Sequence, residues 1–166
     1  MTRWQHIFLA VKLLPHLLFR REVRAMLWQM RQFCGALPTI LHPPLSQALA
    51  QLEQEEAHFP ASIGEERMRD LADLAALLAI RSPLGLCLRR SLTRYHFLRG
   101  MGVPVQVHFG ARLVGDKADR DVTGHAWLVR NGRPYYEAEE NWRDFTVILR
   151  WPHAGDTPVA AEPQSH

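Results

Sequence analysis

A cysteine and a histidine in the second half of the chain have the types and positions expected of a nucleophile and its base. Cys87 follows Gly85 at the predicted start of a helix, and His125 lies within the strand-like run 124–130. The unpaired N–H groups at the start of a helix lower the pKa of a thiol there and provide one oxyanion donor, the N–H of Cys87. An imidazole can take up the thiol proton and return it. The two side chains together indicate a cysteine nucleophile site.

An acid that orients the imidazole completes such a site, and Glu137 on the following predicted strand is the first candidate. A two-residue turn at Asn131-Gly132 sends Glu137 and His125 to opposite faces of the sheet. A three-residue loop with a bulge at Gly132 brings them to the same face. We therefore expect the bulged hairpin, with Glu139 as the reserve acid on that face.

The other reactive side chains have simpler interpretations. Cys34 lies inside an amphipathic helix and is interpreted as a small core residue. Arg89 and Arg90 are interpreted as solvated helix residues, and Trp127 as core or as a pocket wall. A lone cysteine or histidine is more often structural, so the functional interpretation depends on the joint placement of Cys87 and His125.

Length and composition indicate one globular domain with a helical extension. The chain has 166 residues, 47% of them hydrophobic, and a net charge of +3. No helix-turn-helix, zinc-finger or RNA-binding signature occurs, so we expect no nucleic-acid partner. Two cysteines form no disulfide framework, which favours reduced thiols and a cytoplasmic protein. The spacing of His and Cys predicts no metal site, and we expect no cofactor.

The apolar run 7–19 resembles a signal peptide only superficially. Lys12, Pro15 and His16 interrupt it, no small-residue cleavage site follows, and it is too short to span a bilayer. The sequence favours an amphipathic helix packed on the domain over one lying on a membrane surface.

The hydrophobic period changes from helical to strand-like near residue 102, which predicts an α+β fold. Gly35 is expected to end the second helix before a linker at 37–42, and Ser62 to cap the fourth helix. Predicted helices cover 4–19, 21–35, 46–57, a segment after Ser62, and 87–99; predicted strands cover 103–110, 124–130, 134–139 and 145–150, with a loop at 115–121. The expected organisation is a helical region at 1–81, a catalytic core at 82–152 and a disordered tail at 153–166.

Four motifs between residues 82 and 140 resemble a known family. They are Gly85-Leu-Cys87-Leu-Arg-Arg-Ser-Leu, Leu98-Arg-Gly-Met-Gly-Val-Pro-Val, Gly124-His125-Ala-Trp-Leu and Asn131-Gly-Arg-Pro. Together they resemble the transglutaminase-like core of lasso-peptide maturation proteases, the B-type leader peptidases. The resemblance implies a papain-like core in which a Cys-bearing helix packs on a small antiparallel sheet. It assigns Cys87 as nucleophile, His125 as base and Glu137 as the acid, where the family usually has aspartate.

The resemblance also implies a function and partners. It implies removal of the leader peptide from a ribosomally made precursor. In a split form such as this, a separate winged-helix leader-recognition protein presents the precursor, and an asparagine-synthetase-like cyclase closes the released core. Two alternatives stay open: an acyltransferase or transglutaminase on the same triad, and an inactive module that only binds peptide.

Overall fold

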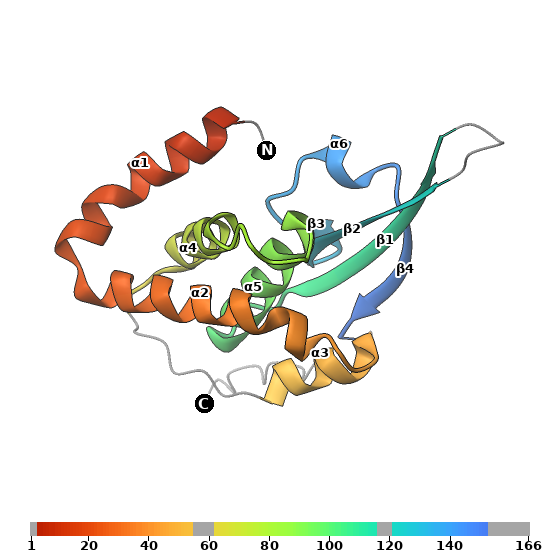
Figure 1. Cartoon of the computed structure of the whole chain (residues 1–166), viewed down its shortest axis with the longest axis horizontal. Helices are drawn as coiled ribbons and strands as arrows, with labels where there is room; N and C mark the ends of the chain where they lie inside the picture. The colour runs from red at the N-terminus through yellow and green to blue at the C-terminus, as the bar shows by residue number, and fades with distance from the viewer. Residues whose placement is uncertain (1–2, 55–61, 116–120, 153–166) are drawn as a thin grey trace, which may run out of the picture.

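Helices make up the first part of the described chain and an antiparallel sheet the second (Figure 1). The computed structural model describes residues 3–54, 62–115 and 121–152. The elements are α1 (Arg3–Phe19), α2 (Arg21–Ile40), α3 (Leu45–Gln54), α4 (Glu65–Leu78), α5 (Leu86–Gly100), β1 (Gln106–Val114), β2 (Asp121–Arg130), β3 (Arg133–Pro134), α6 (Glu139–Trp142) and β4 (Thr146–Trp151). The predicted α+β fold is confirmed.

Helix α5, which carries Cys87, lies at the centre, between the other helices and the sheet. One continuous hydrophobic cluster joins residues of α1, α2, α4, α5 and the sheet, with Leu71 and Leu92 fully buried within it. A buried ion pair ties α4 to α5: Arg94 donates to both carboxylate oxygens of Asp73, at 2.5 and 2.6 Å. Such two-pronged pairing fixes geometry as well as charge, so α5 is held rigidly from the helical side.

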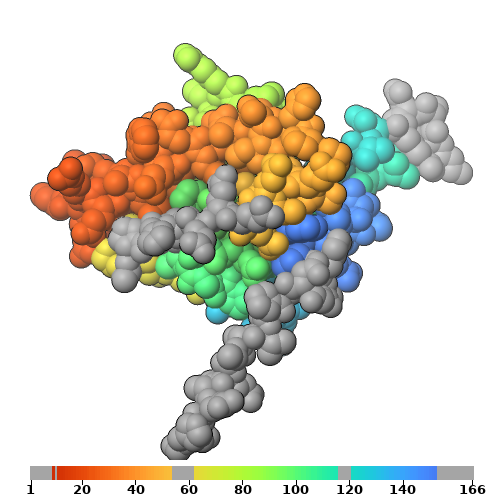
Figure 2. Space-filling model, turned by 90° about the horizontal axis from the view of Figure 1, so that it is seen from below, coloured from red at the N-terminus to blue at the C-terminus, as the bar shows by residue number. Residues whose placement is uncertain are grey.

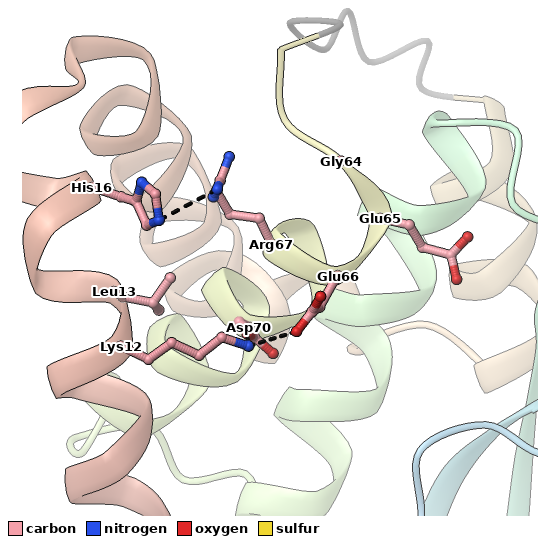
Figure 3. A pocket seen from close by; sticks show the side chains of 8 residues that line it. All are labelled: Lys12, Leu13, His16, Gly64, Glu65, Glu66, Arg67 and Asp70. Atoms are coloured by element: carbon pink, nitrogen blue, oxygen red, sulfur yellow. Dashed lines mark hydrogen bonds and ion pairs between the residues drawn. The ribbon is translucent and has the colours of Figure 1, made fainter.

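Helix α1 packs against α4 through both apolar and charged contacts (Figure 3). Leu13 is buried, while Lys12 donates to Glu66 at 2.6 Å and to Asp70 at 2.7 Å. His16 lies 3.3 Å from Arg67 across the same pocket. Within the described ranges, no helix is both long and apolar enough to cross a membrane.

Two helix boundaries differ from the sequence-based expectation. Helix α2 continues through Gly35 and Pro38 to Ile40, so the linker expected at 37–42 is wrong. Leu37 is fully buried, and its packing outweighs the roughly 1 kcal/mol by which glycine disfavours a helix. Ser62 is not the cap of α4: Gly64 holds that position, and the Ser62 hydroxyl donates to Glu22 at 2.6 Å.

The sheet has the strand order β3-β2-β1-β4 and is antiparallel throughout. Its β2–β3 hairpin has a two-residue turn, with Arg130 paired to Arg133 and positive φ at Asn131 and Gly132. Both φ values suit the tight turns that match strand twist. The expected bulge at Gly132 is therefore wrong, although the hairpin itself is confirmed.

The third strand is much shorter than the predicted run 134–139. Strand β3 ends at Pro134, and the short helix α6 begins at Glu139. The fourth strand is confirmed as β4. Of the expected loop at 115–121, Asp121 belongs to β2; residues 116–120, like the predicted tail 153–166, lie outside the described residues.

Candidate active site

The start of α5 places the Cys87 thiol. Gly85 is the N-cap residue with extended backbone, and Arg89 N–H donates to its carbonyl at 3.1 Å. The amides before Arg89 therefore lack intrahelical partners. A methyl group on Gly85 would make an ordinary van der Waals contact with the Cys87 sulfur, at 3.8 Å.

The face of α5 that carries Cys87 contacts β2 along the side that β3 leaves uncovered. The Ser91 hydroxyl, one turn beyond Cys87, donates to the carbonyl of Ala126 at 2.7 Å. The N–H of Ala126 interacts with the Cys87 thiol and helps to lower its pKa. The N–H and C=O of one residue in an antiparallel strand point to the same side. Because β3 ends at Pro134, this side of β2 is open to α5 and not to another strand.

Cys87 and His125 form an interacting pair. The hydrogen bond with His125 is the main influence lowering the pKa of Cys87; burial opposes it, and the amides of Ala126 and Leu88 assist. Burial lowers the pKa of His125, but Cys87 and Glu137 more than offset this and raise it to about 9. The lowered pKa of Cys87 and the raised pKa of His125 both favour a thiolate facing an imidazolium near neutral pH.

Glu137 lies beside the imidazole of His125. Its carboxylate oxygen Oε1 is 3.8 Å from His125 Nε2, which is an ion-pair distance and too long for a hydrogen bond. Burial raises the pKa of Glu137, but His125, Arg90 and Asn141 together lower it to about 2. The carboxylate is therefore ionised throughout the neutral range.

Two further residues hold the Glu137 carboxylate. Arg90 Nη2 donates to Oε2 at 2.5 Å, and Asn141 Nδ2 donates to Oε1 at 2.9 Å. The side chains of Arg90 and Glu137 are only 9% and 2% exposed. A buried charge is costly unless its partner is present. Arg90 therefore neutralises the Glu137 carboxylate and holds it in place.

Aromatic rings fix the plane of the imidazole. His125 stacks on Trp127, with ring centroids 5.8 Å apart and planes 18° apart, and Phe145 lies 5.2 Å away. Gly110, paired with His125 across the sheet, makes room for both rings. A β-carbon on Gly110 would come within 2.9 Å of Trp127 and Phe145. Trp127 is buried, in line with its interpretation as core or as a pocket wall.

Glu137 reaches the imidazole because the chain leaves the sheet, not because the hairpin bulges. Tyr135 N–H still donates to Leu128 at 2.8 Å, and Tyr136 then adopts a φ of 50°. The Arg69 guanidinium lies 3.8 Å from the Tyr136 ring centroid and supports this unusual conformation. The reserve acid, Glu139, is 60% exposed and pairs with Arg143, so the structure brings Glu137 and not Glu139 to His125.

The arginines after Cys87 are not solvated, contrary to expectation. Arg89 is buried and donates to the carbonyls of Leu84 and Ser82, at 2.7 and 3.4 Å. Arg90 lies three residues after Cys87 and so on the same helix face, a spacing that could have pointed to the site. Nothing in the sequence pattern marked Asn141. Cys34 is fully buried beside Thr93 at 3.1 Å, which agrees with its interpretation as core.

A comparison with family models identifies the fold family. The model of the transglutaminase-like superfamily matches residues 39–150. The chain belongs to the transglutaminase-like superfamily. Searches of curated proteins and of solved structures gave no significant match.

Membership of the transglutaminase-like superfamily points to cysteine-dependent peptidase or acyl-transfer chemistry. The matched region holds Cys87, His125 and Glu137, and extends back into the helical half to residue 39. In the described part of the chain, no three His, Cys, Asp or Glu side chains gather so as to hold a metal ion. The arrangement suits formation of a thioester on Cys87.

Proposed function

We propose that this chain is a cysteine peptidase that removes the leader peptide from a ribosomally made lasso-peptide precursor. The observation that carries the proposal is the Cys87 thiol paired with His125, whose Nε2 atom lies 3.8 Å from the buried Glu137 carboxylate. Superfamily membership supports the chemistry. The four motifs between residues 82 and 140 support the choice of substrate.

In the first step the Cys87 thiolate attacks the carbonyl carbon of the scissile peptide bond. A carbon–sulfur bond forms, and the carbonyl π electrons move to oxygen. The amide of Cys87, unpaired at the start of α5, donates to this oxyanion. His125, protonated below about pH 9, then gives its proton to the departing amine as the carbon–nitrogen bond breaks.

In the second step water replaces the amine. Neutral His125 takes a proton from the water as its oxygen attacks the thioester, and the Cys87 thiolate leaves. Glu137 stays ionised in both steps, since its pKa is about 2. Its role is to hold the imidazole plane and to stabilise the imidazolium, while Arg90 keeps the carboxylate in place.

The proposal includes two protein partners in the cytoplasm. A separate winged-helix leader-recognition protein binds the leader and presents the precursor to Cys87. An asparagine-synthetase-like cyclase forms the macrolactam on the released core. Both follow from the motif resemblance to split leader peptidases.

The test is cleavage of a precursor peptide in the presence of the recognition protein, followed by mass spectrometry. We expect leader and core products from the wild type, none from Cys87→Ala with an unchanged circular dichroism spectrum, and normal cleavage by Cys34→Ala. Full cleavage by Cys87→Ala would overturn the proposal. Amide adducts with an added primary amine would instead support acyl transfer, and retained biological function in Cys87→Ser would support a binding module.

A further inference from the structure

A second feature near the nucleophile is a groove of about 530 Å³ between α2 and the segment that joins α4 to α5. Arg31, Gly35 and Pro38 form one wall, since they lie on one face of α2 at helical spacing. Residues 78–83 form the other wall. Figure 2 shows this segment in light green, projecting beside the orange surface of α2.

The groove combines apolar surface with positive charge. Leu78 and Ile80 are 44% and 81% exposed, which is unusual for large aliphatic side chains that lie together. Arg31 and Arg81 contribute two exposed guanidinium groups, and no acidic residue lines the groove. Among the described residues, neither arginine has an ion-pair partner. This surface is complementary to an extended peptide with acidic and aliphatic side chains.

The groove is joined directly to the nucleophile helix. Arg89, two residues after Cys87, donates to the carbonyls of Ser82 and Leu84 and so fixes the groove wall to α5. Pro83 lies four residues before Cys87 (87 − 83), a separation of at most about 14 Å in extended chain. The wall of the groove therefore ends within about 14 Å of Cys87, a span that a few residues of extended peptide can cover.

We infer that this groove binds an acidic, aliphatic segment of the peptide substrate and so delivers the scissile bond to Cys87. The inference rests on the proposed function, since the occupant is part of the peptide that is cut. Beyond the proposed function, the inference specifies that the bound segment of the substrate is acidic and aliphatic, and that the residues lining the groove bind it.

The groove can be filled without disturbing the fold. A β-carbon on Gly35 would meet no atom within 4 Å, and any residue but proline suits a helix better than glycine. Gly35→Trp therefore blocks the groove, and Arg31→Glu/Arg81→Glu reverses its charge. Arg21→Glu/Arg150→Glu is the matched control, because it makes the same charge change at exposed positions outside the groove.

Binding is measured by fluorescence anisotropy on the full-length Cys87→Ala chain, so that no cleavage is needed. The probe is a fluorescein-labelled peptide of repeated Glu-Leu-Val units, compared with a Gln-Leu-Val version. We expect the acidic probe to bind at least about ten-fold more tightly than the Gln probe and to weaken about ten-fold in both groove variants, with little change in the control.

Equal binding by groove variants and control, no preference for the acidic probe, or no binding at all would overturn the inference. Preferential binding of phosphatidylglycerol vesicles over the peptide at this surface would also overturn it. With Cys87 intact, Gly35→Trp should raise KM for the precursor and leave kcat unchanged. Probe binding without any precursor cleavage would refute the proposed function while leaving the binding groove in place.

Discussion

Replacing Arg90 by methionine should destabilise the protein strongly, because it leaves the Glu137 carboxylate buried without its nearest counter-charge. The two side chains are 9% and 2% exposed, and the guanidinium lies 2.5 Å from the carboxylate. Removing one member of a buried pair costs about 3–5 kcal/mol. Asn141 still donates to Glu137, and His125 stays 3.8 Å away. We therefore expect the lower end, about 3 kcal/mol.

A double variant separates the pair interaction from the loss of packing. In Arg90→Met/Glu137→Gln no buried charge is left unpaired. We expect this variant to be more stable than the sum of the two single changes predicts, with a coupling free energy of about 2 kcal/mol. Arg143→Met is the matched control: Arg143 also pairs with a glutamate, Glu139, but both are largely exposed. Arg143→Met should change the free energy of unfolding by no more than about 0.5 kcal/mol.

The assay is urea unfolding followed by far-ultraviolet circular dichroism at pH 7, with free energies compared at constant slope. Thermal unfolding should agree, with a fall in Tm of about 6–12 °C for Arg90→Met at this chain length. If Arg90→Met proves no more destabilising than Arg143→Met, or if the two single changes simply add, the buried-pair reasoning is refuted.

Three more predictions follow from the same site. Glu137→Gln should move the alkaline limb of the pH profile of kcat/KM below about pH 9, because Glu137 helps to raise the pKa of His125; an unmoved limb would contradict this role. The pKa of Glu137 falls from 4.5 to about 2 on folding, so the stability that this carboxylate contributes is complete above pH 4.5 and is lost as the pH falls toward 2. The free energy of unfolding should therefore drop by up to about 3 kcal/mol across that range. Glu137→Gln should lack this drop. Gly110→Ala should cost about 1–3 kcal/mol in urea unfolding and reduce cleavage, since its β-carbon clashes with Trp127 and Phe145; wild-type stability would show that the rings can move aside freely.

Much of the fold was predictable because its elements have a clear hydrophobic period. The change from helical to alternating spacing near residue 102 predicted the α+β division, and Asn131-Gly132 predicted the hairpin. The end of α2 was not predictable from local signals, since burial of Leu37 overrides the stop suggested by Gly35. Local propensity is a weak guide wherever tertiary packing is strong.

The sequence pointed to residues that the structure brings together, but not to the geometry by which they meet. Cys87 and His125 were singled out by a helix start and a strand, and the structure brings them together with Glu137. The way in which the chain brings Glu137 to His125 was predicted wrongly. The decisive feature is the positive φ of Tyr136, and no local sequence motif indicates it. Arg90 was missed because a charged helix residue has no sequence signature of burial; its buried partner is 47 residues away.

The pairing of Cys87 with His125 is tested most directly by the reactivity of the two thiols toward iodoacetamide as a function of pH, with peptide mass spectrometry to separate them. We expect Cys87 to react with a midpoint below the value of a free thiol, which is about 8.5, because His125 lowers its pKa. His125→Ala should move this midpoint upward. Buried Cys34, whose pKa is raised by burial, should stay unmodified in the folded protein. A Cys87 midpoint at the free-thiol value that His125→Ala leaves unchanged would contradict the central claim, that His125 holds Cys87 as a reactive thiolate.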